Sequence, residues 1–235
     1  MNLLGAAIEN PWATLQRLLD GPLHPGGREA TGRLLDRAGV DPGTQLLDVG
    51  CGAGDAVNLA RERGAAAVGL DADPTSAPTD AVVRGDLGRL PVRTESVDVV
   101  LAECVLCLAA DLDGALAEAK RVLVPGGRLA LSDIVVRGTP PNLPDALAEP
   151  LCLTGDRHPD QLVESVEQAG LSIVDSRDHP EDLLAMRDRV RSRVDYERLL
   201  GAMGERGQRM LEGIERLEAA VESEQVGYIS VVAER

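Results

Sequence analysis

Short apolar runs alternate along the chain with longer segments whose apolar residues recur at helical spacing. Seven runs rich in Val, Leu, Ile and Ala follow residue 41: TQLLDVG, AAAVGLD, AVVRGD, SVDVVLAE, RLALSDIVV, LSIVDS and GYISVVAE. Two intervening segments, DAVNLARERG and DGALAEAKRVLVPGG, have apolar positions three and four residues apart and are closed by Gly. This alternation predicts an α/β domain with a mostly parallel sheet and helices packed on it.

Three regions lie outside this alternation, and we expect each to contribute to a lid. Residues 1–40 contain two amphipathic segments, NPWATLQRLLDG and GGREATGRLLDRAGV, which would form helices at the carboxyl rim of the strands. Prolines at positions 140, 141 and 144 break regular structure after the fifth strand. Residues 180–224 are typical of two or three helices. We therefore expect N-terminal helices over 1–40 and one domain over 41–235, with lid insertions at about 137–164 and 180–224.

Composition and charge narrow the range of partners. A chain of 235 residues is long enough for one full hydrophobic core. The net charge is −15 and Lys120 is the only lysine, so the chain has no basic stripe for a phosphate backbone. The N-terminus lacks a basic leader, and no apolar run reaches the roughly 18 residues that a bilayer requires. We expect a cytoplasmic monomer or homodimer without nucleic-acid or membrane partners.

The stretch LLDVGCGAGD is the most informative one about the class of ligand. An apolar strand ends at Asp48, and Gly50, Gly52 and Gly54 then alternate before a helix. Such glycines let the backbone approach a ligand and leave the amides of the helix N-terminus free to bind it. The dinucleotide fingerprint G-x-G-x-x-G fails because position 55 is Asp. The spacing is G-x-G-x-G, preceded by an acid.

At this loop the chain resembles the class I S-adenosylmethionine-dependent methyltransferases, and the resemblance covers about residues 41 to 136. Four further segments match in order: GLDADP, RGDLGRLPV, VDVVLAECVLCL and EAKRVLVPGGRLALSDIVV. The resemblance implies a Rossmann-like, seven-stranded, mostly parallel sheet in the order 3-2-1-4-5-7-6, with helices on both faces and a helical lid. It also implies a methyltransferase that takes S-adenosylmethionine as cofactor, releases S-adenosylhomocysteine and acts on a small-molecule methyl acceptor.

The same resemblance implies which residues hold the cofactor. Asp71 would accept both ribose hydroxyls, Asp86 would lie near the adenine amine, and Leu87 would cover the adenine ring. The predicted cofactor set is Asp48, Gly50, Cys51, Gly52, Gly54, Asp71, Ala72, Asp86, Leu87 and Glu103. A non-enzymatic alternative stays open, in which the protein binds the cofactor as a sensor or scaffold.

Within this superfamily, the segment ECVLCLAADLDGALAEAKRVLVPGGRLALSDIVV is most similar to the arsenite methyltransferases. Cys104 falls on a cysteine position of that group, and Cys152 in PLCLTGDR falls on the cysteine of a C-x-x-G-A segment. The resemblance implies that Cys104 and Cys152 hold a thiol-seeking acceptor such as trivalent arsenic, which prefers sulfur ligands. The chain departs from that group at Asp156, which stands in place of Ala, and it has no cysteine after residue 152.

Other interpretations of the cysteines stay open. Four cysteines do not form a disulfide framework, so we expect thiols unless chemistry uses them. Cys104 and Cys107 have the spacing of a redox pair, but free cysteines also pack as small apolar side chains. No second C-x-x-C and no paired His motif completes a zinc site, so we predict no metal.

If the acceptor is instead a small organic metabolite or natural product, N-, O- or C-methylation depends on positioning. A general base is then needed only for a protonated nucleophile. Glu103 and Asp133 are candidate bases near the ends of strands four and five, and His158 and His179 are candidates in the flanking loops. The predicted catalytic set is Glu103, Cys104, Cys152 and His158.

Overall fold

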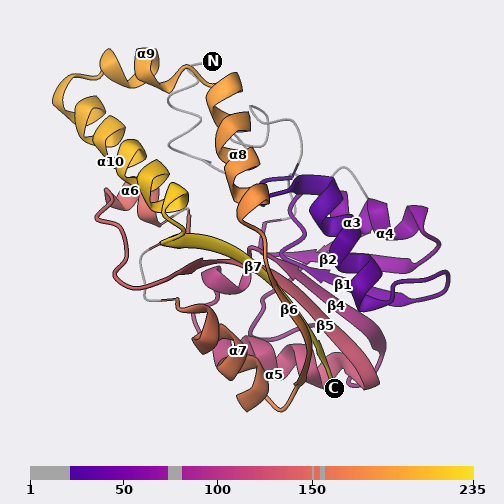
Figure 1. Cartoon of the computed structure of the whole chain (residues 1–235). Helices are drawn as coiled ribbons and strands as arrows, with labels where there is room; N and C mark the ends of the chain where they lie inside the picture. Colours follow the sequence, from indigo (N-terminus) through magenta and orange to yellow (C-terminus); the bar gives the residue numbers. More distant parts are fainter. Residues whose placement is uncertain (1–21, 74–80, 150, 154–156) are drawn as a thin grey trace.

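Seven strands form one mixed sheet in the computed structural model, which describes residues 22–73, 81–149, 151–153 and 157–235 (Figure 1). The strand order β3-β2-β1-β4-β5-β7-β6 confirms the prediction. Neighbours from β3 to β5 are parallel, and β7 runs antiparallel to both β5 and β6. The strands are β1 (Gln45–Val49), β2 (Ala66–Asp71), β3 (Val82–Arg84), β4 (Val97–Glu103), β5 (Leu123–Val136), β6 (Ser172–Asp178) and β7 (Val226–Glu234).

Helices cover both faces of this sheet (Figure 1). The flanking helices are α3 (Gly27–Ala38), α4 (Asp55–Glu62), α5 (Leu112–Val122) and α7 (Pro159–Gln168). In β1, Leu46 packs in the apolar cluster of α3 and α4, whereas Leu47 packs in the cluster of α5 and α7. Because successive strand residues point to opposite faces, a sheet covered on both sides needs such continuous apolar runs.

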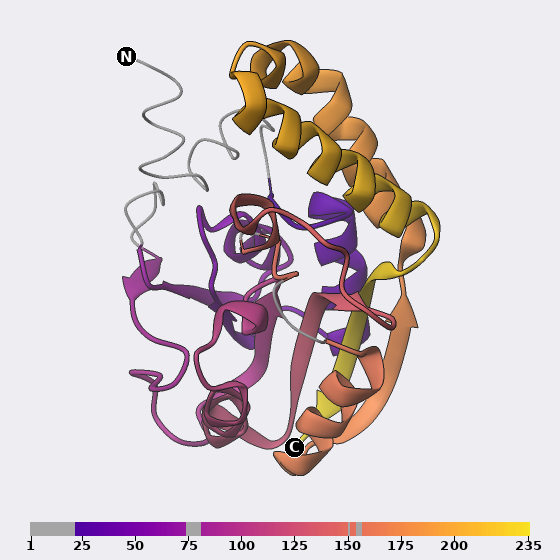
Figure 2. The ribbon, with the colours of Figure 1, turned by 90° about the vertical axis from the view of Figure 1, so that its left-hand side faces the viewer.

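The segments beyond β5 carry the remaining helices, which are α6 (Asp145–Ala148), α8 (Pro180–Arg193), α9 (Tyr196–Gly201) and α10 (Gly204–Glu222). Figure 2 shows α8 and α10 together at the top of the molecule, above the edge where β6 ends and β7 begins. A separate apolar cluster joins α6 and α10 to the ends of β5 and β7. The three helices after β6 agree with the expected helical content, and the lid role of both insertions stays a prediction.

Two stretches differ from the expected elements or lie outside the description. The predicted helix DGALAEAKRVLVPGG ends at Val122, because Pro125 cannot continue a helix and Leu123 already pairs with Val97. The first N-terminal amphipathic segment lies outside the described residues, so the lid role of residues 1–40 stays a prediction. The second segment forms α3.

Within the described part of the chain, no helix is long and apolar enough to cross a membrane.

Candidate active site

The glycine loop after β1 has a backbone that other residues rarely adopt. Gly50, Gly52 and Gly54 all have positive φ, at 71°, 53° and 84°. The amides of Gly50 and Cys51 donate to the Leu70 carbonyl at 2.7 and 3.1 Å, which ties the loop to β2. The loop therefore has a fixed shape directly in front of the N-terminus of α4.

Asp71 joins this loop to the end of β2. Its Oδ2 accepts a hydrogen bond from the Gly52 amide at 2.9 Å, and its Oδ1 accepts from the Asp73 amide at 2.8 Å. Ala72 lies exposed between the two acids. The structure thus brings the predicted ribose acid and the glycine loop together.

The other predicted cofactor residues lie along the same edge of the sheet. Asp86 follows β3 and accepts a hydrogen bond from the Gly88 amide at 2.7 Å, which shapes its own turn. Leu87 is partly buried against the core beneath α5. Cys51 packs against β2, where a Cβ built on Gly69 would lie 2.5 Å from its sulfur. Burial raises the pKa of the Cys51 thiol, so this side chain is neutral and apolar in character.

Two buried carboxylic acids lie at the carboxyl ends of the neighbouring strands β1 and β4. Asp48 is 3% exposed, and the Glu103 side chain is 6% exposed. Asp48 Oδ2 and Glu103 Oε1 are buried and have no hydrogen-bond partner among the described residues. Burial raises the pKa of both acids, and the charge of Glu103 raises that of Asp48 further. An uncompensated pair of this kind favours a cationic ligand.

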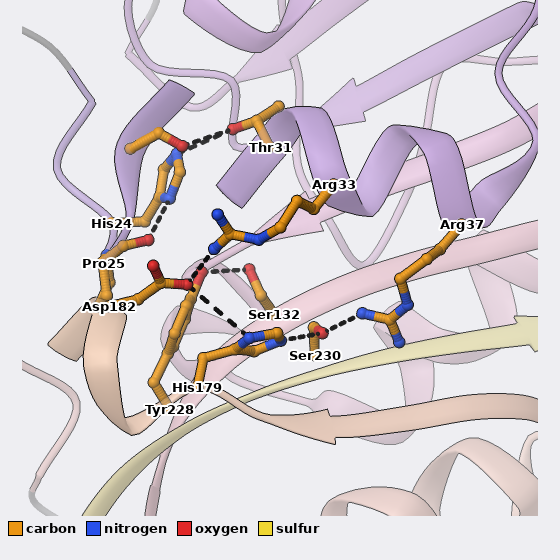
Figure 3. A network of polar contacts seen from close by, with 11 residues as sticks. His24, Pro25, Thr31, Arg33, Arg37, Ser132, His179, Asp182, Tyr228 and Ser230 are labelled. Carbon is orange, nitrogen blue, oxygen red and sulfur yellow. Dashed lines mark hydrogen bonds and ion pairs between the residues drawn. The ribbon is translucent and has the colours of Figure 1, made fainter. Parts of the chain in front are cut away.

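Glu103 takes part in a polar network on the α3 side of the sheet. Figure 3 shows its partners Thr31 and His24. Thr31 Oγ1 donates to Glu103 Oε2 at 2.8 Å, and His24 Nε2 lies 3.7 Å from the same oxygen. Sequence reasoning missed both residues. Thr31 is 1% exposed on the apolar face of an amphipathic helix, and a polar residue in that register is a signal that could have identified it.

The same network continues to α8 and β7 (Figure 3). His179 Nε2 lies 2.6 Å from Ser230 Oγ, which also accepts from Arg37 Nη1 at 2.5 Å. Asp182 forms an ion pair with Arg33 and lies 3.8 Å from His179 Nδ1. Burial lowers the pKa of His179. His179, a candidate base, is thus held between α8 and β7 by groups of its own.

The cysteines are arranged differently from the expectation. Cys107 and Cys152 form a disulfide, with Cα atoms 5.8 Å apart, and this corrects the expectation of free thiols at these two positions. Cys107 lies in the short helix η2 (Leu106–Leu108) after β4, and Cys152 lies in the insertion after α6. The fold brings these segments together across 45 residues, a pairing that no local spacing indicates. Cys152 therefore pairs with Cys107, and the structure does not join it to Cys104.

Cys104 remains a free cysteine directly after β4. It has a positive φ of 51°, and its amide donates to the Ser132 carbonyl at 2.8 Å. Loss of solvent, reinforced by the charges of Asp133 and Glu103, raises the pKa of its thiol well above the usual range. Cys104 is therefore a neutral thiol rather than a thiolate ligand.

The remaining candidate bases have structural partners. Asp133 Oδ2 accepts from the Cys107 amide at 3.1 Å and lies 3.3 Å from Arg157 Nη1. Burial raises the pKa of Asp133 to about 6, although the charge of Arg157 opposes the shift.

His158 caps α7, where its Nδ1 accepts from the Asp160 amide at 3.4 Å and Gln161 completes a capping box. The structure does not bring His158 to Glu103.

Comparisons with known proteins agree with this geometry. A family model described as a methyltransferase domain matches residues 47–131. Methyltransferase GfsG of Streptomyces halstedii is 34% identical over 204 residues, which cover 79% of this chain and 73% of GfsG. The chain belongs to the class I S-adenosylmethionine-dependent methyltransferases. The enzyme class and the methyl donor predicted from the sequence are thereby confirmed.

This methyltransferase is also similar to enzymes with differing acceptors. Arsenite methyltransferase of Halobacterium salinarum is 34% identical over 157 residues, covering 59% of this chain and 40% of that protein. Nocamycin O-methyltransferase of Saccharothrix syringae is 38% identical over 140 residues, covering 53% and 49%. The crystal structure of the [4+2]-cyclase SpnF has the same fold, with a TM-score of 0.70 at 22% identity, covering 99% and 91%. The arsenite group is therefore one of several similar groups.

The residues at the strand ends fit S-adenosylmethionine, which carries a sulfonium and an ammonium. A Cβ built on Gly52 meets no atom within 4 Å, so open space adjoins the loop there. At Gly50, by contrast, a Cβ would lie 2.1 Å from Val105 Cγ2. Space beside the loop, amides of a helix N-terminus and two buried acids, each with one oxygen that lacks a partner among the described residues, together suit a cationic ligand with a carboxylate tail.

Substitution of Gly52 tests the use of this space. We expect Gly52→Ala to weaken S-adenosylmethionine binding about tenfold or more, an effect of at least 1.4 kcal/mol, because the methyl group occupies room that the ligand needs. Calorimetric titration measures the affinity. Gly126→Ala is the matched control, since Gly126 also has positive φ, at 78°, and no atom within 4 Å of a built Cβ. Equal affinity in the two variants would contradict the assignment.

The disulfide between Cys107 and Cys152 should make the free energy of unfolding depend on the oxidation state of the protein. Because it closes a loop of 45 residues, its loss should lower the free energy of unfolding by about 4 kcal/mol. Urea unfolding of the oxidised protein, with and without reductant, measures the difference. Reductant should have no further effect on a Cys107→Ser variant. A parent protein equally stable under both conditions would show that the bond does not form.

Proposed function

We propose that this methyltransferase transfers the methyl group of S-adenosylmethionine to a hydroxyl oxygen of a small organic acceptor, with Glu103 as the general base. The observation that carries the proposal is the Glu103 carboxyl group, which is buried at the carboxyl end of β4 with one oxygen lacking a partner among the described residues. Ligands of open α/β sheets bind at this edge. A hydroxyl acceptor must lose its proton as the new C–O bond forms.

The cofactor residues have separable roles in this proposal. The Gly52 and α4 amides would bind the cofactor carboxylate, Asp71 would accept from the ribose hydroxyls, and Asp86 would lie near adenine. Asp71 would then exchange its hydrogen bond from the Gly52 amide for bonds to the ribose. When bound, the cofactor supplies an electrophilic methyl group on a positively charged sulfur. Asp48 and Glu103 would stabilise that charge.

The pKa of Glu103 supports the role of base. Burial raises it from its ordinary value, and His24, whenever its ring is protonated, and the hydrogen bond from Thr31 limit that rise. A carboxylate with a raised pKa accepts a proton more readily near neutral pH. Asp133 and His158, two other candidate bases, lack a buried, unpartnered acceptor atom like Glu103 Oε1. Asp133 forms an ion pair with Arg157, and His158 caps a helix.

Substitution of Glu103 separates chemistry from cofactor binding. With phenolic, enolic and carboxylic acceptors, S-adenosylhomocysteine formation measures turnover. We expect Glu103→Gln to reduce kcat by about 10²- to 10⁴-fold, because the amide cannot accept the proton. Glu164→Gln on the exposed surface of α7 is the control. Full turnover in Glu103→Gln would exclude the base, and tight cofactor binding with no acceptor consumed by the parent would favour a sensor or scaffold.

The proposed role of Glu103 predicts that kcat/KM declines on the acid side of its pH profile. The charged groups near Glu103 are Asp48, His24, Arg33, Arg37 and His179. The carboxylate is the active form, so kcat/KM should fall as the pH falls through a pKa higher than the ordinary 4.5. Residual turnover in Glu103→Gln should lack this decline. An unchanged decline in that variant would assign the titration to another group.

A thiol-seeking acceptor is the second candidate, and the proximity of Cys107 and Cys152 favours it. After reduction, the two sulfurs would be available at the substrate edge of the sheet, with Cα atoms 5.8 Å apart. Two thiolates within reach of one another suit trivalent arsenic. The sequence prediction paired Cys104 with Cys152, whereas the geometry favours Cys107 as the second ligand.

Arsenite binding by reduced protein tests this candidate. Calorimetric titration should give strong binding to the parent, loss of binding in Cys107→Ser and Cys152→Ser, and retention in Cys104→Ser. Loss confined to Cys104→Ser and Cys152→Ser would restore the pairing predicted from sequence. Absence of arsenite binding by the parent, with hydroxyl methylation present, would leave only the first proposal.

A further inference from the structure

We propose that Thr31 and His24 complete a proton relay with Glu103, which carries the acceptor's proton from the buried carboxylate to the imidazole. The inference rests on the proposed role of Glu103 as base, and it adds two residues to that role. Thr31 lies in α3 and His24 in the segment before it (Figure 3). Glu103 ends β4, so only the tertiary fold brings the three residues together.

The three side chains form a continuous path. Thr31 Oγ1 lies 2.8 Å from Glu103 Oε2 and 3.2 Å from His24 Nε2, so the hydroxyl bridges the carboxylate and the ring. The far nitrogen of the ring, His24 Nδ1, lies 3.1 Å from the Pro25 carbonyl oxygen. Thr31 is 1% exposed and the His24 side chain is 10% exposed. A proton leaving Glu103 on this side therefore passes through the hydroxyl rather than through bulk water.

The hydrogen-bond partners assign the protons. The Pro25 carbonyl oxygen accepts only, so His24 Nδ1 carries a hydrogen and the neutral ring presents the lone pair of Nε2 to Thr31. The Thr31 hydroxyl has one proton, which it donates to Glu103 when that group is a carboxylate. Two further acceptors lie at longer distances from the hydroxyl, His24 Nε2 at 3.2 Å and the Gly27 carbonyl oxygen at 3.4 Å. Once Glu103 is protonated it donates to Thr31, whose own proton then turns to His24 Nε2, and this gives the relay its direction.

The proton transfer needs no reactant besides the acceptor and the methyl donor. As the C–O bond forms and the C–S bond breaks, the acceptor hydroxyl gives its proton to the Glu103 carboxylate. Rotation of the protonated carboxyl group about its Cγ–Cδ bond then brings its O–H to Thr31 Oγ1. As that proton passes to Thr31, the original Thr31 proton moves to His24 Nε2. The products are a regenerated carboxylate and an imidazolium, whose Nε2 lies 3.7 Å from Glu103 Oε2. His24 finally releases the proton to solvent.

Other polar groups beside Glu103 have partners that remove them from this path. The cavity next to Glu103 is lined by Arg33, Arg37, Ser132, His179, Tyr228 and Ser230. Arg33 is paired with Asp182, and the Tyr228 hydroxyl donates to Ser132. His179 contacts Ser230 rather than Glu103. Among the described residues, hydrogen bonds to the Glu103 carboxylate come from Thr31.

The tautomer of His24 provides a test that needs no acceptor. Nitrogen-15 NMR of the histidine-labelled full chain with S-adenosylhomocysteine resolves three rings, and His24→Gln assigns the one of interest. We expect neutral His24 to carry its hydrogen on Nδ1. A hydrogen on Nε2 in the neutral ring would overturn the relay, because Nε2 could then not accept a proton, while leaving the base role of Glu103 intact.

Turnover with the acceptor found for the parent tests the relay itself. Thr31→Val should lower kcat about tenfold or more, with KM and cofactor affinity within twofold, because it removes the bridge but keeps the side-chain shape. Thr31→Ser should restore most of the loss. The double variant Thr31→Val/His24→Gln should be no slower than the slower single variant, because both residues act in series.

The Thr31 and Glu103 variants distinguish a failure of the relay from a failure of Glu103 as the base. Full turnover in Thr31→Val, or additive losses in the double variant, would overturn the relay. If Glu103→Gln is inactive in the same assays, the base role survives that result. If Glu103→Gln is fully active, both proposals fail. Thermal unfolding of Thr31→Val and Thr31→Ser, expected to be cooperative and above the assay temperature for both, shows that the comparison concerns folded protein.

Discussion

The burial of two carboxylic acids at the ends of adjacent parallel strands is the constraint on which the site depends. Asp48 and Glu103 each have one buried oxygen that no described residue satisfies. Taking such groups out of water is costly, and each acid raises the cost of ionising the other. The fold tolerates this arrangement because the sheet, covered on both faces, holds the strand ends rigidly. A cationic ligand relieves both costs at once.

The elements around this pair form two groups, the glycine loop on one side and the surroundings of Glu103 on the other. The glycine loop, fixed to β2 through Leu70 and Asp71, offers amides and open space. The helix α3 contributes Thr31 to Glu103 on one side, and its Arg33 and Arg37 fasten it to α8, β6 and β7. The position of Glu103 is therefore coupled to the packing of helices that lie far from it in sequence.

Much of the fold and of the cofactor loop could be predicted from sequence, because the relevant signals are local. The apolar runs fix the strands, and the glycine spacing between Asp48 and Asp55 specifies both the turn and the class of ligand. The pairing of Cys107 with Cys152 and the contact of Thr31 with Glu103 span 45 and 72 residues. No spacing rule encodes such contacts. His158, predicted as a catalytic residue, caps α7 instead, because a local pattern of histidine before proline is as typical of a helix N-terminus as of a base.

The central claim is that the buried acids bind the cofactor's positive charge, and its most direct test is the proton balance of binding. Titrating S-adenosylmethionine into the protein in buffers of different ionisation enthalpy, between about pH 5 and 7, measures the protons exchanged. Because burial raises the pKa of Asp48 and Glu103, the account predicts proton release on binding, reduced in Asp48→Asn. Binding without proton release at any of these pH values, or equal release in Asp48→Asn, would contradict it.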